Sequence, residues 1–255
     1  MSKNRLELFR KKRLTEISKR KGRAVKPSTV NRDVSNLRAM LNKALEHAKI
    51  EINPIGRIKL LEENNVRERV LSQDEFESLY LHCPPSLKGI VLIGFYLPMR
   101  QAEILNLTWK EIDLKMRFIR LGGERTKNKI GRNIPLHPRI IKFLRTCPRP
   151  IDGGYVFGNS RRFNRKAYNK AVESAGIADF NFHDLRHCAI NNMRLAGNDH
   201  FVIKQASGAQ TDSAFQRYNL VTEQEMKSIK WLDEKSGKSG TMDTYMDTST
   251  KTKIV

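Results

Sequence analysis

The chain of 255 residues has few cysteines, and Cys83, Cys147 and Cys188 stand far apart from one another. Their separations lack the short paired spacing of a zinc module, and three isolated cysteines do not make a disulfide framework. This pattern favours a reducing, intracellular environment and argues against a cysteine-based metal site.

The sequence also lacks a long apolar run. It has no segment of about 18 or more apolar residues that could span a bilayer. Its first residues, MSKNRLELFRKKRL, are too charged for the apolar part of a signal peptide. We therefore expect no membrane partner and a protein that stays in the cytoplasm, where it is made.

Acidic residues are scarce beside basic ones. The chain has 27 Asp and Glu against 48 Lys and Arg, which gives a formal net charge of +21. The cations are spread along the whole chain and do not concentrate on one amphipathic, membrane-binding helix. A polyanion, and nucleic acid in particular, is the expected partner. Solubility alone requires a smaller net charge.

Residues 1–65 are predicted to form a small basic helical domain. A short amphipathic helix is expected over 4–21, and a second begins near residue 27. Apolar residues share one face of this second helix: Val30, Val34, Leu37, Leu41, Leu45 and Ala48. The opposite face carries Arg32, Arg38 and Lys43, which are predicted to lie along a DNA backbone. A solvated face is an equally good interpretation of this segment alone. Residues 57–70 are expected to be a linker.

Residues 70–235 are predicted to form a second, larger and mostly helical domain. Ser72 and Glu75 have the spacing of a capping box at a helix start. Residues 86–97 are apolar almost all round, which predicts a helix buried at the centre of the domain. Pro98 and Met99 end this helix and place Arg100 at the start of the next one.

Three short segments, 111–114, 117–121 and 133–136, predict a small antiparallel sheet, so the fold class is mainly α with some α+β character. The last two segments are joined by a basic hairpin, and Asn128 and Gly131 suit its turn. From this hairpin Lys129 and Arg132 are predicted to contact DNA. Residues 236–255 are rich in Ser, Gly, Thr and Lys, so we expect a disordered tail.

The stretch from 183 to 218 concentrates residues that suit attack on a phosphodiester. His183 and Arg186 are three residues apart, so on a helix they share a face and can both point at one anion. Tyr218 follows after two glycine breaks. His183 and His187 also have the spacing of two zinc ligands on a helix. Arg186 near the same face would repel a cation, and no third ligand is evident, so no metal site is predicted.

Taken one at a time, these residues have simpler interpretations. Arg100 can pair with Glu103 on a helix surface. Tyr218 is one of six tyrosines, and a lone tyrosine on a helix is more often a half-buried core residue than a nucleophile. No local feature of the sequence singles out Lys127, and Lys129 on the same hairpin could have the same role. The functional interpretation depends on the set as a whole.

Four segments together resemble the motifs of the tyrosine recombinases, the phage integrase family: PMRQAEILNLTWKEID, TKNKIGRNIPL, HDLRH and FQRYN. The resemblance covers residues 27–233. It implies a catalytic set of Arg100, Lys127, His183, Arg186 and Tyr218. It also implies double-stranded DNA as substrate, no cofactor, a homotetramer on DNA with a monomer as the free form, and a location at the bacterial nucleoid.

The chemistry of such a set follows from its charges. Attack on a phosphodiester builds up negative charge on the phosphoryl oxygens, and Arg100 and Arg186 can stabilise it because guanidinium pairs bidentately with phosphate. His183 can donate a hydrogen bond or move the phenolic proton of Tyr218. Lys127 can protonate the leaving 5′ oxygen. The product is a 3′-phosphotyrosine, which keeps the bond energy for rejoining.

The sequence departs from the family pattern at three places. Nine residues before Tyr218, where the family usually has His or Trp, this chain has Ala209, and loss of one such donor lowers a rate by ~10²–10³-fold. Leu97-Pro98 replaces a common Thr-Gly before Met99. The N-terminal domain is short, as in a truncated or relic protein.

Two alternatives therefore stay open beside an active recombinase. One is a DNA-binding protein without catalysis, which Ala209 and the short N-terminal domain favour. The other is a type IB topoisomerase, which uses similar chemistry without needing a specific site or a tetramer.

Overall fold

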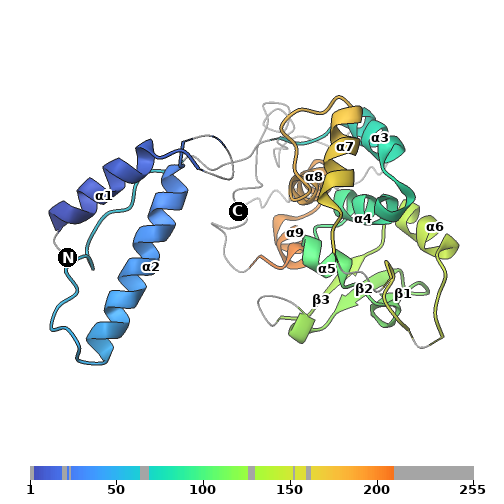
Figure 1. Cartoon of the computed structure of the whole chain (residues 1–255). Helices are drawn as coiled ribbons and strands as arrows, with labels where there is room; N and C mark the ends of the chain where they lie inside the picture. The colour runs from blue at the N-terminus through green and yellow to red at the C-terminus, as the bar shows by residue number, and fades with distance from the viewer. Residues whose placement is uncertain are drawn as a thin grey trace, which may run out of the picture. The chain divides into compact units, whose positions relative to one another are not determined.

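The computed structural model describes residues 3–18, 22, 24–63, 69–125, 130–151, 153–158 and 162–209. The chain divides into two compact units, residues 1–69 and 70–255, which are described separately (Figure 1). Among the described residues, no helix combines the length and the apolar character needed to cross a bilayer.

The first unit is built on two helices, α1 (Lys3–Thr15) and α2 (Pro27–Glu46), which lie side by side (Figure 1). Leu6, Val34 and Ile55 are fully buried between them and the segment that follows α2. The apolar stripe predicted on α2 supplies core only over its first part. Leu45 is 40% exposed, and Ala48 lies beyond the end of the helix with a φ of 52°.

The segment after α2 returns along that helix. Residues 57–63 were predicted to belong to a linker, but the structure shows them bound to α2. The buried side chain of Asn31 donates to the Leu61 carbonyl oxygen and accepts from the Leu61 amide, each at 2.8 Å. Arg38 donates through Nη2 to the Ile58 carbonyl oxygen at 2.5 Å. These side chains satisfy backbone groups that would otherwise face the helix without partners.

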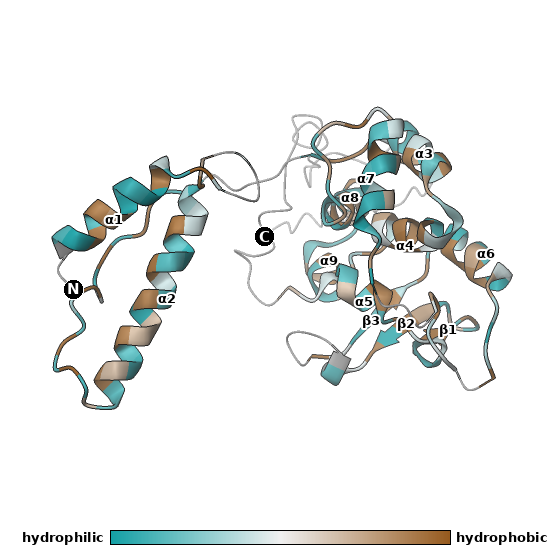
Figure 2. Ribbon diagram, viewed as in Figure 1, coloured by the Kyte–Doolittle hydropathy of each residue, from teal (hydrophilic) through white to brown (hydrophobic). Residues whose placement is uncertain are grey.

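In the second unit, α4 (Pro85–Tyr96) lies in the middle with α3 (Gln73–His82), α6 (Pro138–Thr146) and α8 (Asp184–Leu195) around it (Figure 1). Nearly every side chain of α4 from Leu87 to Phe95 is buried, which confirms the predicted central helix. Among the described residues of this unit, the remaining α-helices are α5 (Gln101–Leu105), α7 (Arg165–Ser174) and α9 (His200–Ser207). The ribbon coloured by hydropathy shows brown segments where these helices meet (Figure 2).

The predicted capping box at the start of α3 is present. The Glu75 amide donates to Ser72 Oγ at 3.1 Å, and the Ser72 amide donates to Glu75 Oε2 at 2.9 Å. Two of the amides that a helix start leaves without partners are thereby satisfied.

The sheet has three antiparallel strands in the order β1 (Ile112–Asp113), β2 (Phe118–Leu121) and β3 (Arg132–Pro135). Two short 3-10 turns, Trp109–Glu111 and Gly123–Arg125, flank it. Along β3 the side chains alternate, with Arg132 and Ile134 buried and Asn133 and Pro135 exposed. The buried face of β3 packs against α9, so Arg132 points into the domain.

Candidate active site

Arg186 occupies the first turn of α8, and its guanidinium is buried. The residue is 4% exposed, and its guanidinium donates to two backbone carbonyl oxygens, one on Pro98 and one on Ser207, the latter at 2.9 Å. Pro98 lies two residues before Arg100, and Ser207 is the last residue of α9. Arg186 therefore ties α8 to two segments that are far from it in the sequence.

Arg100 stands at the N-cap of α5, as predicted, and reaches the same place. Its side chain is 27% exposed, and Nη2 donates to the carbonyl oxygen of Gly208 at 3.3 Å. Since Arg186 binds the carbonyl of Ser207, the two guanidinium groups meet at consecutive carbonyls. Arg186 is buried and Arg100 is partly exposed, which is an arrangement that can hold a phosphate group.

Glu103 holds Arg100 in this position. Its Oε1 accepts from Arg100 Nη1 at 3.0 Å, and its Oε2 accepts from the Arg100 backbone amide at 2.7 Å. Burial raises the pKa of Glu103, but hydrogen bonds from Arg132 and Arg100 outweigh it and bring the pKa below its ordinary value of 4.5. The carboxylate is therefore charged at neutral pH. The predicted Arg100–Glu103 pair exists, but with a carboxylate that is buried.

Arg132 was predicted to contact DNA, and the structure places its side chain elsewhere. The side chain is 5% exposed and forms an ion pair with Glu103, with 2.7 Å between Nη2 and Oε2. Its Nε donates to the Ala206 carbonyl oxygen at 2.9 Å. In this structure the guanidinium is directed into the protein. The signal for this was in the sequence, because Arg132 shares its strand face with Ile134 and Leu136.

Gly208 ends α9 in the left-handed region, with a φ of 67°. A Cβ at this position would lie 3.0 Å from Nη1 of Arg132 and 3.1 Å from its Cζ. Both the backbone conformation and the close approach of the guanidinium require glycine here. Ala209 follows, half-buried, beside the apolar pair Ile190 and Ile203, and its methyl group offers no hydrogen-bond donor.

His183 is the N-cap residue of α8, one turn before Arg186. Burial lowers the pKa of His183 below its ordinary value of 6.5, and the nearby charges of Arg186 and Arg100 lower it further. The imidazole is therefore neutral at pH 7 and can accept a proton. Its ring centroid lies 5.7 Å from that of His187. Over the described ranges, no three His, Cys, Asp or Glu side chains are grouped as a metal site would need.

The other predicted residues are placed as follows. Lys127, Lys129 and Tyr218 lie outside the described residues, as does the predicted tail of 236–255. Arg32 and Lys43 are exposed on α2, and their contact with DNA stays a prediction. Arg38 is half-buried and donates to the Ile58 carbonyl oxygen, so part of its donor capacity is used within the first unit.

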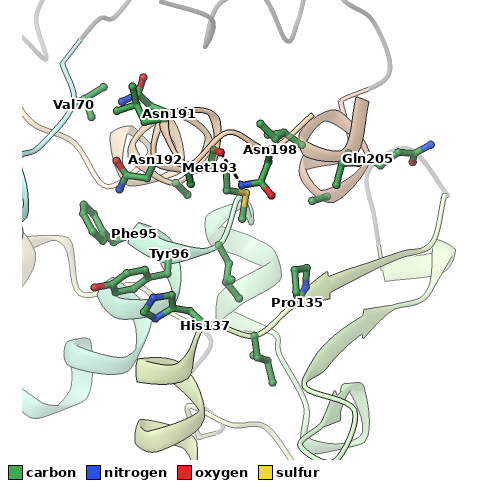
Figure 3. Close-up of a pocket in the computed structure, with 18 of the residues that line it drawn as sticks. Val70, Phe95, Tyr96, Pro135, His137, Asn191, Asn192, Met193, Asn198 and Gln205 are labelled. Atoms are coloured by element: carbon green, nitrogen blue, oxygen red, sulfur yellow. Dashed lines mark hydrogen bonds between the residues drawn. The ribbon is translucent and has the colours of Figure 1, made fainter. Parts of the chain in front are cut away.

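A separate hollow of about 1000 Å³ lies between α4, α8, α9 and the sheet (Figure 3). Tyr96 and His137, stacked with 3.9 Å between ring centroids, face Asn192 and Met193 across it (Figure 3). The described lining is apolar or neutral, since burial lowers the pKa of His137 below its ordinary value of 6.5. The residues described as lining it include no Lys or Arg, in contrast to the arginine cluster of Arg100 and Arg186.

The sequence and the fold match known proteins. Residues 69–225 match the model of the Phage integrase family. The chain is 30% identical over 215 residues to a shufflon-specific DNA recombinase of Escherichia coli, covering 82% of this chain and 55% of that protein. It is 27% identical over 203 residues to an integrase of Salmonella phage P22, covering 72% and 52%. The chain thus spans about half the length of these curated relatives.

Solved structures with the same fold include two integrases bound to DNA. The Tn1549 transposon integrase in complex with a circular intermediate DNA has a TM-score of 0.68 at 17% identity, covering 89% of this chain and 85% of that one. A lambda integrase dimer bound to a COC′ core site has a TM-score of 0.67 at 15% identity, covering 96% and 84%. Since the identities are only 17% and 15%, this similarity shows the fold alone.

Proposed function

Because the chain belongs to the phage integrase family, we propose that it is a site-specific tyrosine recombinase that breaks and rejoins DNA strands. The observation that carries the proposal is the convergence of Arg100 and Arg186 on the consecutive carbonyls of Gly208 and Ser207. Two fixed guanidinium groups suit the charge that develops on a phosphoryl group under attack.

In the proposed reaction the Tyr218 phenolic oxygen attacks the phosphorus of a DNA phosphodiester. A new bond forms between phosphorus and the tyrosine oxygen, and the bond to the 5′ oxygen breaks. Neutral His183 accepts the phenolic proton, and Lys127 gives a proton to the leaving 5′ oxygen. Arg100 and Arg186 stabilise the five-coordinate state. The 3′-phosphotyrosine keeps the energy of the broken bond, so the reverse attack by another 5′ hydroxyl needs no cofactor.

The proposed partner is double-stranded DNA, with a homotetramer assembling on it and a monomer as the free form. The net charge of +21 and DNA in the complexes of the Tn1549 and lambda integrases support the substrate. Because its proposed substrate is DNA, we also propose that the protein is located at the nucleoid in the bacterial cytoplasm.

Ala209 supports a second candidate, an integrase-like protein that binds DNA with weakened or absent catalysis. The family's usual His or Trp would add a donor to the transferring phosphoryl group, and the methyl group of Ala209 cannot. Loss of one preorganised donor costs ~10²–10³-fold in rate. On that scale the protein would be slow, and a further defect would be needed to abolish activity.

Covalent trapping tests these proposals. The protein is incubated with nicked, partly randomised duplexes whose cleavage releases a short fragment, and a denaturing gel is examined for a protein–DNA adduct. We expect an adduct with the natural chain that is absent for Tyr218→Phe. An adduct that forms with Ala209→His alone would favour the weakened enzyme. DNA binding without an adduct from any variant would favour the DNA-binding protein, and relaxation of supercoiled plasmid by monomers would favour a topoisomerase.

A further inference from the structure

Arg132 joins three segments that are far apart in the sequence. It lies on β3, its Nη2 is 2.7 Å from Oε2 of Glu103 on α5, and its Nε is 2.9 Å from the carbonyl oxygen of Ala206 on α9. The side chains of Arg132 and Glu103 are each 5% exposed. A buried ion pair with both partners hydrogen-bonded keeps its geometry, since separating either partner would leave a charge uncompensated.

Glu103 is shared between two arginines, and this changes the charge available at Arg100. One oxygen of the carboxylate accepts from Arg100 Nη1, and the other accepts from Arg132 Nη2. One negative charge thus stands between two positive ones, and the trio has a net charge of +1. Without Arg132, Glu103 would neutralise Arg100, and the guanidinium would attract a phosphate less strongly.

The same guanidinium also supports the turn that Arg100 binds. The Arg132 guanidinium approaches Gly208 so closely that an added Cβ would lie 3.0 Å from Nη1. Arg100 donates to the carbonyl oxygen of this same glycine. The end of α9 is therefore held by Arg132 at the Ala206 carbonyl and by Arg100 at the Gly208 carbonyl.

We infer that Arg132 is a positioning residue of the strand-transfer site, which acts through Glu103 on the placement and charge of Arg100 and through Ala206 on the end of α9. The inference rests on the proposed recombinase function. Arg132 does not itself touch the reacting atoms. Its effect is expected in the rate of the chemical step and less in the affinity for DNA.

The test compares Arg132→Met and Arg132→Lys with the unsubstituted chain of 255 residues. Arg120→Met is the matched control, because Arg120 also lies in the sheet and pairs with Asp113 through a side chain that is 49% exposed. Two quantities are measured on a duplex selected by the trapping assay: the rate of adduct formation at saturating protein and the dissociation constant for DNA. Thermal unfolding checks that each variant folds.

We expect Arg132→Met to slow adduct formation by at least about 10-fold, as a small misplacement of a catalytic group does. Its dissociation constant should stay within about threefold of the natural value, a change of under 1 kcal/mol. Arg132→Lys should recover part of the rate, because an ammonium group can still balance Glu103. Arg120→Met should match the natural chain. A folded Arg132→Met variant that forms adduct within twofold of the natural rate would overturn the inference.

A second measurement does not need catalysis, so it separates this inference from the proposed function. The pKa of the Glu103 carboxyl is measured by carbon NMR in the same variants. Arg132 lowers this pKa, so Arg132→Met should raise it, and Arg120→Met should leave it unchanged. If Arg132→Met does not fold, Arg132→Lys is used, and a smaller rise is expected. An unchanged Glu103 pKa in the folded variant would overturn the inference even if the natural chain forms no adduct.

Discussion

Arg186 and Ser207 are joined by a hydrogen bond from the guanidinium Nη2 to the backbone carbonyl oxygen, 2.9 Å long. The same guanidinium donates through Nη1 to the carbonyl of Pro98. Carbonyl groups orient a guanidinium without cancelling its charge, in contrast to a carboxylate. Arg186 therefore serves both the fold, as a tie between α8 and the ends of two other segments, and the proposed chemistry, as a fixed cation.

Arg186→Lys is expected to reduce both stability and activity. Lysine keeps the charge but cannot direct two donors at the Pro98 and Ser207 carbonyls. We expect a loss of about 1–3 kcal/mol in the free energy of unfolding, measured in urea. The adduct should form at least about 100-fold more slowly, as when a transition-state donor is removed. Arg194→Lys on the same helix is the control and should retain the natural rate. Natural adduct formation by Arg186→Lys would contradict the assignment.

Glu103 is expected to make stability depend on pH in the acidic range. Its pKa in the folded protein lies below the ordinary value of 4.5, so between the two values the unfolded chain binds more protons. The stabilisation is complete above about pH 4.5 and is lost as the pH falls through the folded pKa. The difference in unfolding free energy between the natural chain and Glu103→Gln should therefore become smaller as the pH falls from about 4.5 through the folded pKa of Glu103.

Urea denaturation of the two proteins between about pH 3 and pH 7 measures this difference. Glu173→Gln, at an exposed position on α7, is the control and should follow the natural curve. A difference that stays constant with pH would show that the Glu103 carboxylate is not the group responsible.

His183 is expected to set the acidic limb of the rate of adduct formation. Burial, with the charges of Arg186 and Arg100, lowers its pKa below 6.5. The rate should therefore rise with pH as the imidazole loses its proton, and it should reach its plateau at a pH that is still below 6.5. His183→Gln should lose this limb and form adduct ~10²–10⁴-fold more slowly. His187→Gln, whose ring is the neighbour of His183, should keep the limb. A limb retained in His183→Gln would assign it to another group.

The Ser72 cap offers a prediction on stability alone. Ser72 Oγ accepts from the Glu75 amide, and removal of a capping hydroxyl costs about 1 kcal/mol. Ser72→Ala should lower the free energy of unfolding by that amount in urea titrations. Ser78→Ala, further along the same helix, is the comparison, and an equal loss there would show that the cap is not the cause.

Local patterns predicted much of the fold. The buried α4, the Ser72–Glu75 capping box and the three strands each depend on spacings of a few residues, which a single sequence displays. The convergence of Arg100 and Arg186 at the end of α9 could be inferred only by resemblance, because their contacts join residues 108 and 21 positions apart.

The failures have the same physical origin. Arg132 was predicted to contact DNA because a cation near a hairpin tip is usually exposed, and its partners lie 29 and 74 residues away in the sequence. Residues 57–63 were predicted to be part of a linker, but they pack along α2. Their backbone is bound by Asn31, 30 residues earlier than Leu61. When the partner of a buried charge is distant in the sequence, the neighbouring residues do not reveal it. The one local indication is the strand face on which the charged residue lies.

Ala209→His tests whether a missing donor limits the reaction. Ala209 follows the turn at Gly208, and its amide donates to Ser207 Oγ at 3.2 Å, so an imidazole at this position starts beside the carbonyls that bind the two arginines. If it reaches the phosphoryl oxygen, the rate of adduct formation should rise by ~10²–10³-fold. Ala209→Leu is the control for size, because it adds bulk beside Ile190 and Ile203 without a donor, and it should give no gain. Equal rates for His and Leu would mean that a donor at residue 209 is not what limits this chain, and the slow step would then be sought in DNA binding or assembly.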